Sequence, residues 1–192
     1  ALMYMTVFIP QFGAKGIWIS IFNAISAFCN AGIDIISPDS LVDYVKNPMI
    51  NLTTDLLIIV SGIGFVVWWD VIERCRELPR KGLKTFKSLT LHSKIALSTT
   101  AVLLLGGTFL FLIFEYNNPN TIGSFTFPEK LQAAFFQYVT TRTAGFAMLP
   151  QKELTNASGL TALFLMFIGG SPAGTAGGIK TVTVTVLAAS AL

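Results

Sequence analysis

One uninterrupted apolar run limits what this chain can fold into. Residues 95–114, IALSTTAVLLLGGTFLFLIF, are 20 residues without a charge. As a helix rising about 1.5 Å per residue, the run is about 30 Å long, the hydrocarbon thickness of a bilayer. The whole chain is only 12% charged, whereas a soluble domain carries about 25% charged residues. We therefore expect an all-α integral membrane protein.

A second apolar run and a basic stretch predict the topology. Residues 52–69 carry one charge, Asp55. We expect Asp55 to cap the helix after Asn51 or to lie at the interface, in preference to facing the outer vestibule. Residues 70–94 hold seven of the 13 Lys and Arg residues. By the positive-inside rule the loop 71–94 is cytoplasmic, with Trp68 and Trp69 at the inner interface. The segments on the other side of the two runs are then extracellular.

Two further segments are apolar but too short to cross a bilayer. They are residues 16–28 and 128–139, the length of a re-entrant or buried helix. Pro128 and Glu129 are typical of a helix N-terminus. An amphipathic helix on the outer surface fits the length equally well.

An internal repeat favours the re-entrant interpretation. FNAISAFCNAGID, residues 22–34, aligns without gaps with FFQYVTTRTAGFA, residues 135–147, and places Gly32 opposite Gly145. Each block ends a short helix with a small residue, a glycine and a large apolar residue. A turn at membrane depth is tolerated only when it is buried in protein or lines a watery cavity. Around a glycine, carbonyls can face one way and replace the hydration shell of an alkali cation.

The last apolar segment is too long for a single span. Residues 154–179 are uncharged and are followed by Lys180. Pro172 and the neighbouring glycines predict a helix that is broken and unwound over residues 169–180. The hydroxyls of Ser171 and Thr175 are expected beneath the two glycine turns. A phosphate-binding loop is excluded because Ile179 stands where its second glycine is required.

These motifs resemble a known family. SAFCNAGID and TTRTAGFAM, followed by FLMFIGGSPAGTAGGIKT, are similar to the Trk/Ktr/HKT superfamily of potassium-uptake proteins, and most of all to its bacterial Ktr-type membrane subunit. The resemblance implies tandem M1–pore helix–M2 repeats like those of a potassium channel, with a broken final M2 helix. Residues 1–70 match the second repeat, with M1 mostly missing, the pore helix at 16–28 and M2 at 51–69. Residues 95–192 match the third, with M1 at 95–114, the pore helix at 128–139, and M2 at 158–192 interrupted by an intramembrane loop at 169–180.

The resemblance also implies a function and a site. It implies potassium uptake through a selectivity filter of backbone carbonyls, gated by the glycine-rich loop. The alternative is a sodium-conducting or sodium/potassium-coupled relative. The implied filter residues are Asn30, Ala31, Gly32 and Ile33 in one strand and Thr143, Ala144, Gly145 and Phe146 in the other. The implied gating residues are Gly169, Gly170, Ser171, Pro172, Ala173, Gly174, Thr175, Ala176, Gly177, Gly178 and Lys180.

Partners and location follow from the same resemblance. It implies a homodimer in the cell membrane, in contact with lipids, and a cytosolic ring of RCK-type nucleotide-binding regulatory subunits. No nucleic-acid partner and no organic cofactor are implied. We expect no enzyme, because the chain has one histidine, no activated nucleophile and no carboxylate pair. A broken-helix secondary transporter would predict inverted repeats, whereas these two copies run in the same direction. A membrane scaffold protein without a pore remains an alternative.

Three charged residues lie close to the expected pathway. We expect Arg142 to point behind the filter, tied to a carboxylate or to carbonyls at a helix C-terminus. Lys180 would hold the loop closed by filling a cation site or by pairing with a carboxylate. Asp34 either attracts cations at the outer mouth or is an ordinary solvated loop carboxylate.

Overall fold

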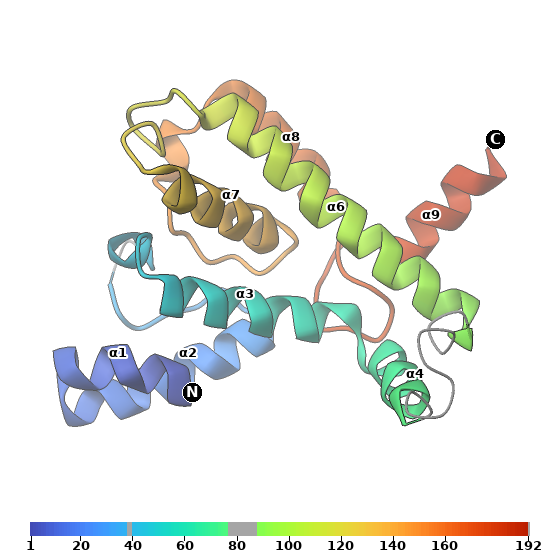
Figure 1. Cartoon of the computed structure of the whole chain (residues 1–192), viewed down its shortest axis with the longest axis horizontal. Coiled ribbons are helices and arrows are strands. Elements are labelled where there is room, and N and C mark those ends of the chain that lie inside the picture. Colours follow the sequence, from blue (N-terminus) through green and yellow to red (C-terminus); the bar gives the residue numbers. More distant parts are fainter. Residues whose placement is uncertain (38–39, 77–87, 192) are drawn as a thin grey trace.

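The regular structure is entirely helical in the described part of the chain. The computed structural model describes residues 1–37, 40–76 and 88–191, so most of the basic loop expected at 71–94 lies outside the described residues. The one β-contact there is an isolated bridge between Ile168 and Ile179. The all-α prediction is therefore confirmed. The helices are α1 (Leu2–Phe12), α2 (Ala14–Phe28), α3 (Pro48–Ile63), α4 (Phe65–Cys75), α6 (Leu91–Glu115), α7 (Phe127–Thr141), α8 (Asn156–Phe167) and α9 (Thr181–Ser190), drawn in Figure 1.

One helix of the described part, α6, is long and apolar enough to cross a bilayer alone. Helices α3 and α4 pass the same test only as a pair, and they are bent by 94°. The expectation of one continuous helix over residues 51–69 was wrong. The helix breaks at Gly64, whose backbone has φ 89° and ψ 144°, a combination that is essentially restricted to glycine.

The start of α3 differs from the expectation as well. Asn47 is the N-cap, and its Oδ1 accepts hydrogen bonds from Met49 N (3.0 Å) and Ile50 N (3.4 Å). Pro48 follows in the first turn, where its missing N–H costs nothing. Asp55 therefore lies inside the helix and is 3% exposed, so it neither caps the helix nor lies at its end.

Helix α7 packs between α3 and α6 (Figure 1). It begins with a capping box, in which Glu129 Oε2 accepts from Thr126 N at 2.8 Å and from Thr126 Oγ1 at 2.9 Å. The hydrogen bond from the Thr126 backbone N–H lowers the pKa of the Glu129 carboxyl. This cap fixes where the short helix α7 begins. It therefore also helps to fix the position of the segment that follows its C-terminus.

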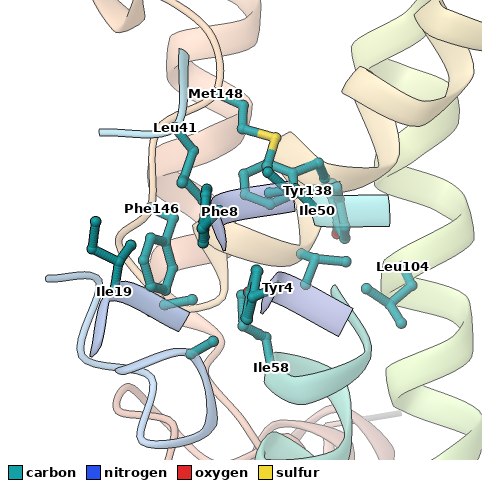
Figure 2. Close-up of a cluster of buried hydrophobic side chains, with 14 residues drawn as sticks. Tyr4, Phe8, Ile19, Leu41, Ile50, Ile58, Leu104, Tyr138, Phe146 and Met148 are labelled. Atoms are coloured by element: carbon teal, nitrogen blue, oxygen red, sulfur yellow. The ribbon is translucent and has the colours of Figure 1, made fainter. Parts of the chain in front are cut away.

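The main apolar core joins α1 to both short helices. In Figure 2, Tyr4 and Phe8 of α1 lie among Ile50, Tyr138 and Phe146 from α3, α7 and the segment after α7. All five side chains are at most 3% exposed. The side chain of Phe146 therefore anchors the segment after α7 in this core. The backbone of the segment is not part of the core.

Two buried carboxylates tie the ends of α6 to other elements. Glu115 is fully buried, and its Oε1 accepts from both Thr155 N and Thr155 Oγ1 at 2.8 Å, at the start of α8. Its Oε2 accepts from Thr121 Oγ1 at 2.7 Å. At the opposite end, Asp70 of α4 accepts from Thr90 N (3.0 Å) and Thr90 Oγ1 (2.8 Å).

Candidate functional site

The two short helices end in turns with the same backbone pattern. After α2, φ is positive at Asn30 (51°) and Gly32 (65°); after α7, it is positive at Thr143 (74°) and Gly145 (90°). Asparagine tolerates this left-handed region, but a β-branched threonine there is a genuine outlier. Such strain persists only where the surrounding structure enforces it, and it gathers at functional sites.

The two turns meet backbone to backbone. A Cβ atom added to Gly32 would lie 2.4 Å from the carbonyl oxygen of Ala144. One added to Gly145 would lie 3.3 Å from the Cα of Gly32. Gly32 therefore requires glycine for space as well as for φ, whereas Gly145 requires it for φ and is only tightly packed. The glycines matched by the sequence repeat are neighbours in space.

Six carbonyl oxygens of these turns are without hydrogen-bond donors. In the part of the chain that the structure describes, none of the carbonyls of Asn30, Ala31 and Gly32, nor those of Thr143, Ala144 and Gly145, accepts a hydrogen bond. Unbonded carbonyls of this kind can serve as ligands for a dehydrated cation.

The fourth carbonyl of each turn is engaged instead. Ile33 O accepts from the Ser26 hydroxyl at the end of α2, and Phe146 O accepts from the Thr140 hydroxyl at the end of α7. The gapless alignment does not pair these two hydroxyls, because Ser26 stands opposite Val139. The sequence comparison therefore missed them, although a hydroxyl in the last turn of each short helix was the signal.

Below the turns, residues 168–180 form a closed loop between α8 and α9. Ile179 N donates to Phe167 O, and Gly169 N donates to Ile179 O, both at 3.0 Å. A Cβ on Gly169 would lie 1.5 Å from the carbonyl oxygen of Gly177, so the two ends of the loop are in direct contact. In Figure 1 the loop descends toward the junction of α3 and α4.

The loop fills the break in α3. Ser171 N donates to Gly62 O at 2.9 Å, and Thr175 N donates to Ser61 O at 3.2 Å. These carbonyls belong to the last turn of α3, where a helix leaves acceptors unsatisfied. Two broken helices thus satisfy each other's backbone groups, which a membrane interior requires.

The other side of the break is also satisfied. Phe65 N, at the start of α4, donates to Ala173 O at 3.3 Å. The indole of Trp68 folds back and donates from Nε1 to Val60 O at 2.7 Å. A Cβ on Gly64 would lie 2.4 Å from Pro172 O, so the loop and the bend approach too closely for any other residue.

The tip of the loop contacts the first residue of each turn. Thr175 Oγ1 accepts from Asn30 Nδ2 at 2.8 Å, and Gly177 N donates to Thr143 Oγ1 at 2.8 Å. The Ser171 hydroxyl instead bonds the hydroxyl of Thr181 at 3.0 Å and is fully buried. Thr175 thus lies against a turn as expected, whereas the expectation for Ser171 was wrong because Ser171 lies at the base of the loop.

Both cationic residues near the loop bond to backbone carbonyls. Arg142 is 8% exposed, and its Nη2 donates to Gly169 O at 3.0 Å, two residues beyond the end of α8. Lys180 Nζ donates to Ala176 O at 2.7 Å. Among the described residues neither forms an ion pair with a carboxylate. Neither alternative given for Arg142 is found among the described residues, because the carbonyl that it binds belongs to the loop and not to a helix C-terminus.

A small cavity lies where the turn, the loop and α3 meet. Its volume is about 10 Å³, and Asn30, Gly62, Arg142 and Gly170 help to line it. That is room for about one water molecule. Asn30 Oδ1 and Arg142 Nε are both buried without a hydrogen-bond partner in the described part of the chain.

The comparisons with known proteins agree with this arrangement. A family described as TrkH, cation transport protein, matches residues 2–192. The chain belongs to the TrkH family. Among its relatives in that family, the potassium/sodium uptake protein NtpJ of Enterococcus hirae is 46% identical over 97% of this chain and 39% of its own length. The Ktr system potassium uptake protein B of Bacillus subtilis is 40% identical over 100% of this chain and 41% of its own length.

A solved structure has the same fold. The potassium transporter TrkH of Vibrio parahaemolyticus matches with a TM-score of 0.69 at 20% identity, over 97% of this chain and 38% of that one. The resemblance to the Trk/Ktr/HKT superfamily and the fold class, an all-α membrane protein of the TrkH family, are thereby confirmed. The chain spans about two fifths of the length of the curated relatives named above.

Proposed function

We propose that this chain forms part of a pathway for potassium uptake across the cell membrane. The observation that carries the proposal is the repeated positive φ at Asn30 and Gly32 and at Thr143 and Gly145, in two turns whose backbones touch. When residues with positive φ alternate with residues with negative φ, successive carbonyl groups can point in the same direction. The C-terminal ends of α2 and α7 add negative helix-dipole potential at the same place.

The carbonyls without hydrogen bonds reduce the proposed ion ligands from four residues to three in each turn. Those of Asn30–Gly32 and Thr143–Gly145 coordinate the ion, because they accept no hydrogen bond in the described part of the chain. Ile33 and Phe146 support the strands from behind, because their carbonyls are bonded to the ends of the short helices. The remaining ligands of a closed ring come from protein outside this chain.

The glycine-rich loop closes the pathway on the inner side of the filter. Its contacts with the first residue of each turn support this role, since both Asn30 and Thr143 bond to it. Arg142 and Lys180 stabilise the closed loop by donating to its carbonyls. Opening requires these bonds to break together.

In this proposal, residues 1–70 form a second and residues 95–192 a third M1–pore helix–M2 repeat, with residues 71–94 in the cytoplasm and the filter facing outward. The protein is a multi-pass homodimer in contact with membrane lipids and with a cytosolic RCK-type nucleotide-binding ring. The names of the Ktr system relatives support a potassium-uptake assembly of this kind.

A sodium-conducting or sodium/potassium-coupled transporter is the second candidate. It is favoured by the name of the relative from Enterococcus hirae, which includes both ions. Uptake of potassium that requires sodium outside the cell would support this candidate over uptake of potassium alone.

Radioactive rubidium uptake by the full-length protein in proteoliposomes tests the filter. Gly32→Ser and Gly145→Ser place a Cβ at positive φ and against the opposite turn, so we expect each to abolish uptake or its preference for potassium over sodium. Gly106→Ser is the control, because nothing lies within 4 Å of a Cβ there. Uptake and ion preference equal to those of Gly106→Ser would contradict the proposal.

A further inference from the structure

The chain after α7 turns back and runs along the helix toward its first residue (Figure 1). Two side chains of α7, three residues apart and hence on one face of the helix, bind this returning segment. The Thr140 hydroxyl donates to Phe146 O at 2.7 Å, directly after the turn. Farther along, the side-chain amides of Gln137 and Gln151 bind each other. The turn after α7 therefore connects two segments that are bound to each other at two points.

The amide pair of Gln137 and Gln151 is reciprocal. Gln137 Nε2 donates to Gln151 Oε1 at 2.9 Å, and Gln151 Nε2 donates to Gln137 Oε1 at 3.1 Å. Gln151 Nε2 also donates to Leu149 O at 3.0 Å, which fixes the direction of that amide. Gln137 is 2% exposed, and a buried amide is costly unless it is hydrogen-bonded. Separation of the returning segment from α7 is therefore unfavourable.

The turn after α2 has the first of these bonds but lacks a counterpart of the second. Ser26 binds the carbonyl of Ile33 in the equivalent way. Asn23, three residues before Ser26, is then the counterpart of Gln137. Asn23 is 1% exposed, and neither its Nδ2 nor its Oδ1 has a hydrogen-bond partner among the described residues. The amide pair thus belongs to one of the two turns and is not a general feature of the repeat.

We propose that Gln137, acting through Gln151, is a positioning residue that fixes the carbonyls of the turn after α7 and so maintains the ion preference of the pathway. The inference rests on the proposed function, in which these carbonyls coordinate the ion. Selection by backbone carbonyls depends on where they lie and how many reach the ion. The two amides act indirectly, because they bond to each other and to Leu149 O rather than to the carbonyls of residues 143–145.

Hydrogen–deuterium exchange of the full-length protein in lipid nanodiscs tests the positioning role without reference to transport. Gln137→Met keeps a side chain of similar volume but breaks both amide bonds, so we expect exchange at the backbone amides of residues 143–149 to accelerate by about twofold or more. Gln132→Met is the matched control on the same helix, because Gln132 donates instead to Val45 O at 3.1 Å. No acceleration in Gln137→Met, or an equal one in both variants, would overturn the proposal.

Uptake by the same variants in proteoliposomes tests the effect on ion preference. We expect the preference for potassium over sodium to fall by about twofold or more in Gln137→Met, and to keep the wild-type value in Gln132→Met. An unchanged preference in Gln137→Met, in a protein that loses uptake or preference in Gly145→Ser, would overturn the proposal. Uptake and preference that survive Gly145→Ser would instead contradict the proposed function, while the exchange measurement still decides whether Gln137 holds the turn.

Gln151 provides the variant that separates the amide pair from misfolding. Gln151 is exposed, so Gln151→Met removes no buried side chain. Because either substitution breaks both bonds of the pair, we expect Gln151→Met to reproduce the changes of Gln137→Met and the double variant to add nothing further. Additive changes in the double variant would refute the pair. If Gln137→Met does not fold, Gln151→Met is decisive, and wild-type exchange and preference in that variant would overturn the proposal.

Discussion

At the scale of single residues, Thr143 joins the proposed filter to the loop. Its φ of 74° is unfavourable for a β-branched residue, by about 1–2 kcal/mol. The neighbouring Ala144 and Phe146 are buried and hold the backbone in place. The Thr143 hydroxyl accepts from Gly177 N at 2.8 Å, so the strained residue is also in direct contact with the loop.

Removing that hydroxyl is expected to loosen the loop. Thr143→Ala deletes a hydrogen bond with a net contribution of about 0.5–1.5 kcal/mol, which shifts the closed-to-open equilibrium by about two- to tenfold. We predict a rise of that size in rubidium leak through the resting full-length transporter. Thr143→Ser, which keeps the hydroxyl, should leak like the wild type. Equal leak in the two variants would show that the bond does not hold the loop.

In the proposed mechanism, Arg142 stabilises the same closed state from the other end of the loop. Arg142→Ala removes the donor to Gly169 O and leaves that buried carbonyl unsatisfied. We predict increased rubidium leak, with partial restoration in Arg142→Lys because the lysine keeps a charged donor on a shorter reach. Intact regulation and unchanged ion preference in Arg142→Ala would remove Arg142 from the mechanism.

At the scale of elements, the bend between α3 and α4 and the loop before α9 form one unit. Each supplies the hydrogen-bond partners that the other lost when its helix broke. Neither break would be stable in a bilayer without the other, because unsatisfied backbone groups there cost several kcal/mol each. Movement of the loop therefore implies movement of α4, which leads toward the residues expected in the cytoplasm.

Two glycines at this junction give a matched pair of variants. Gly64→Ala imposes a positive φ on alanine and places its Cβ 2.4 Å from Pro172 O, whereas a Cβ on Gly62 meets no atom closer than 3.9 Å. We predict that Gly64→Ala lowers Tm and raises rubidium leak, and that Gly62→Ala does neither. Similar behaviour of the two variants would contradict the coupling of bend and loop.

The sequence predicted some of these elements better than others. The short helices and the glycine-rich break were accessible because Pro128, Glu129 and the cluster of glycines are local signals. The bend at Gly64 was not, since a lone glycine in an apolar run predicts nothing until its distant partner, residues 169–180, is placed beside it. Asn47 followed by Pro48 was a local cap signal that the emphasis on Asp55 obscured.

At the scale of the whole molecule, the two turns meet because α1, α2, α3 and α7 share one core. Figure 2 shows Tyr4 and Phe8 beside Phe146, which belongs to the second turn. Helix α6, which runs along α7 and α8 in Figure 1, is fixed at both ends, by Glu115 and by Asp70. The geometry of the two turns thus depends on contacts distributed over most of the described chain.

The proposed orientation is open to a labelling experiment. Cys75 is exposed at the end of α4, on the side expected in the cytoplasm, and Asn117 is exposed just beyond the opposite end of α6. In full-length proteins that keep only the tested cysteine, a membrane-impermeant maleimide added outside intact cells should label Asn117→Cys and spare Cys75. Labelling of Cys75 from outside would reverse the topology.

The central claim is that the two glycine turns coordinate a permeating cation with their backbone carbonyls. Anomalous X-ray diffraction from crystals of the full-length protein in thallium or rubidium salts tests it most directly. We expect an anomalous peak adjoining the carbonyl oxygens of Asn30–Gly32 and Thr143–Gly145, and its loss in Gly145→Ser. Well-ordered turns without an anomalous peak at saturating ion concentration would contradict coordination by these carbonyls.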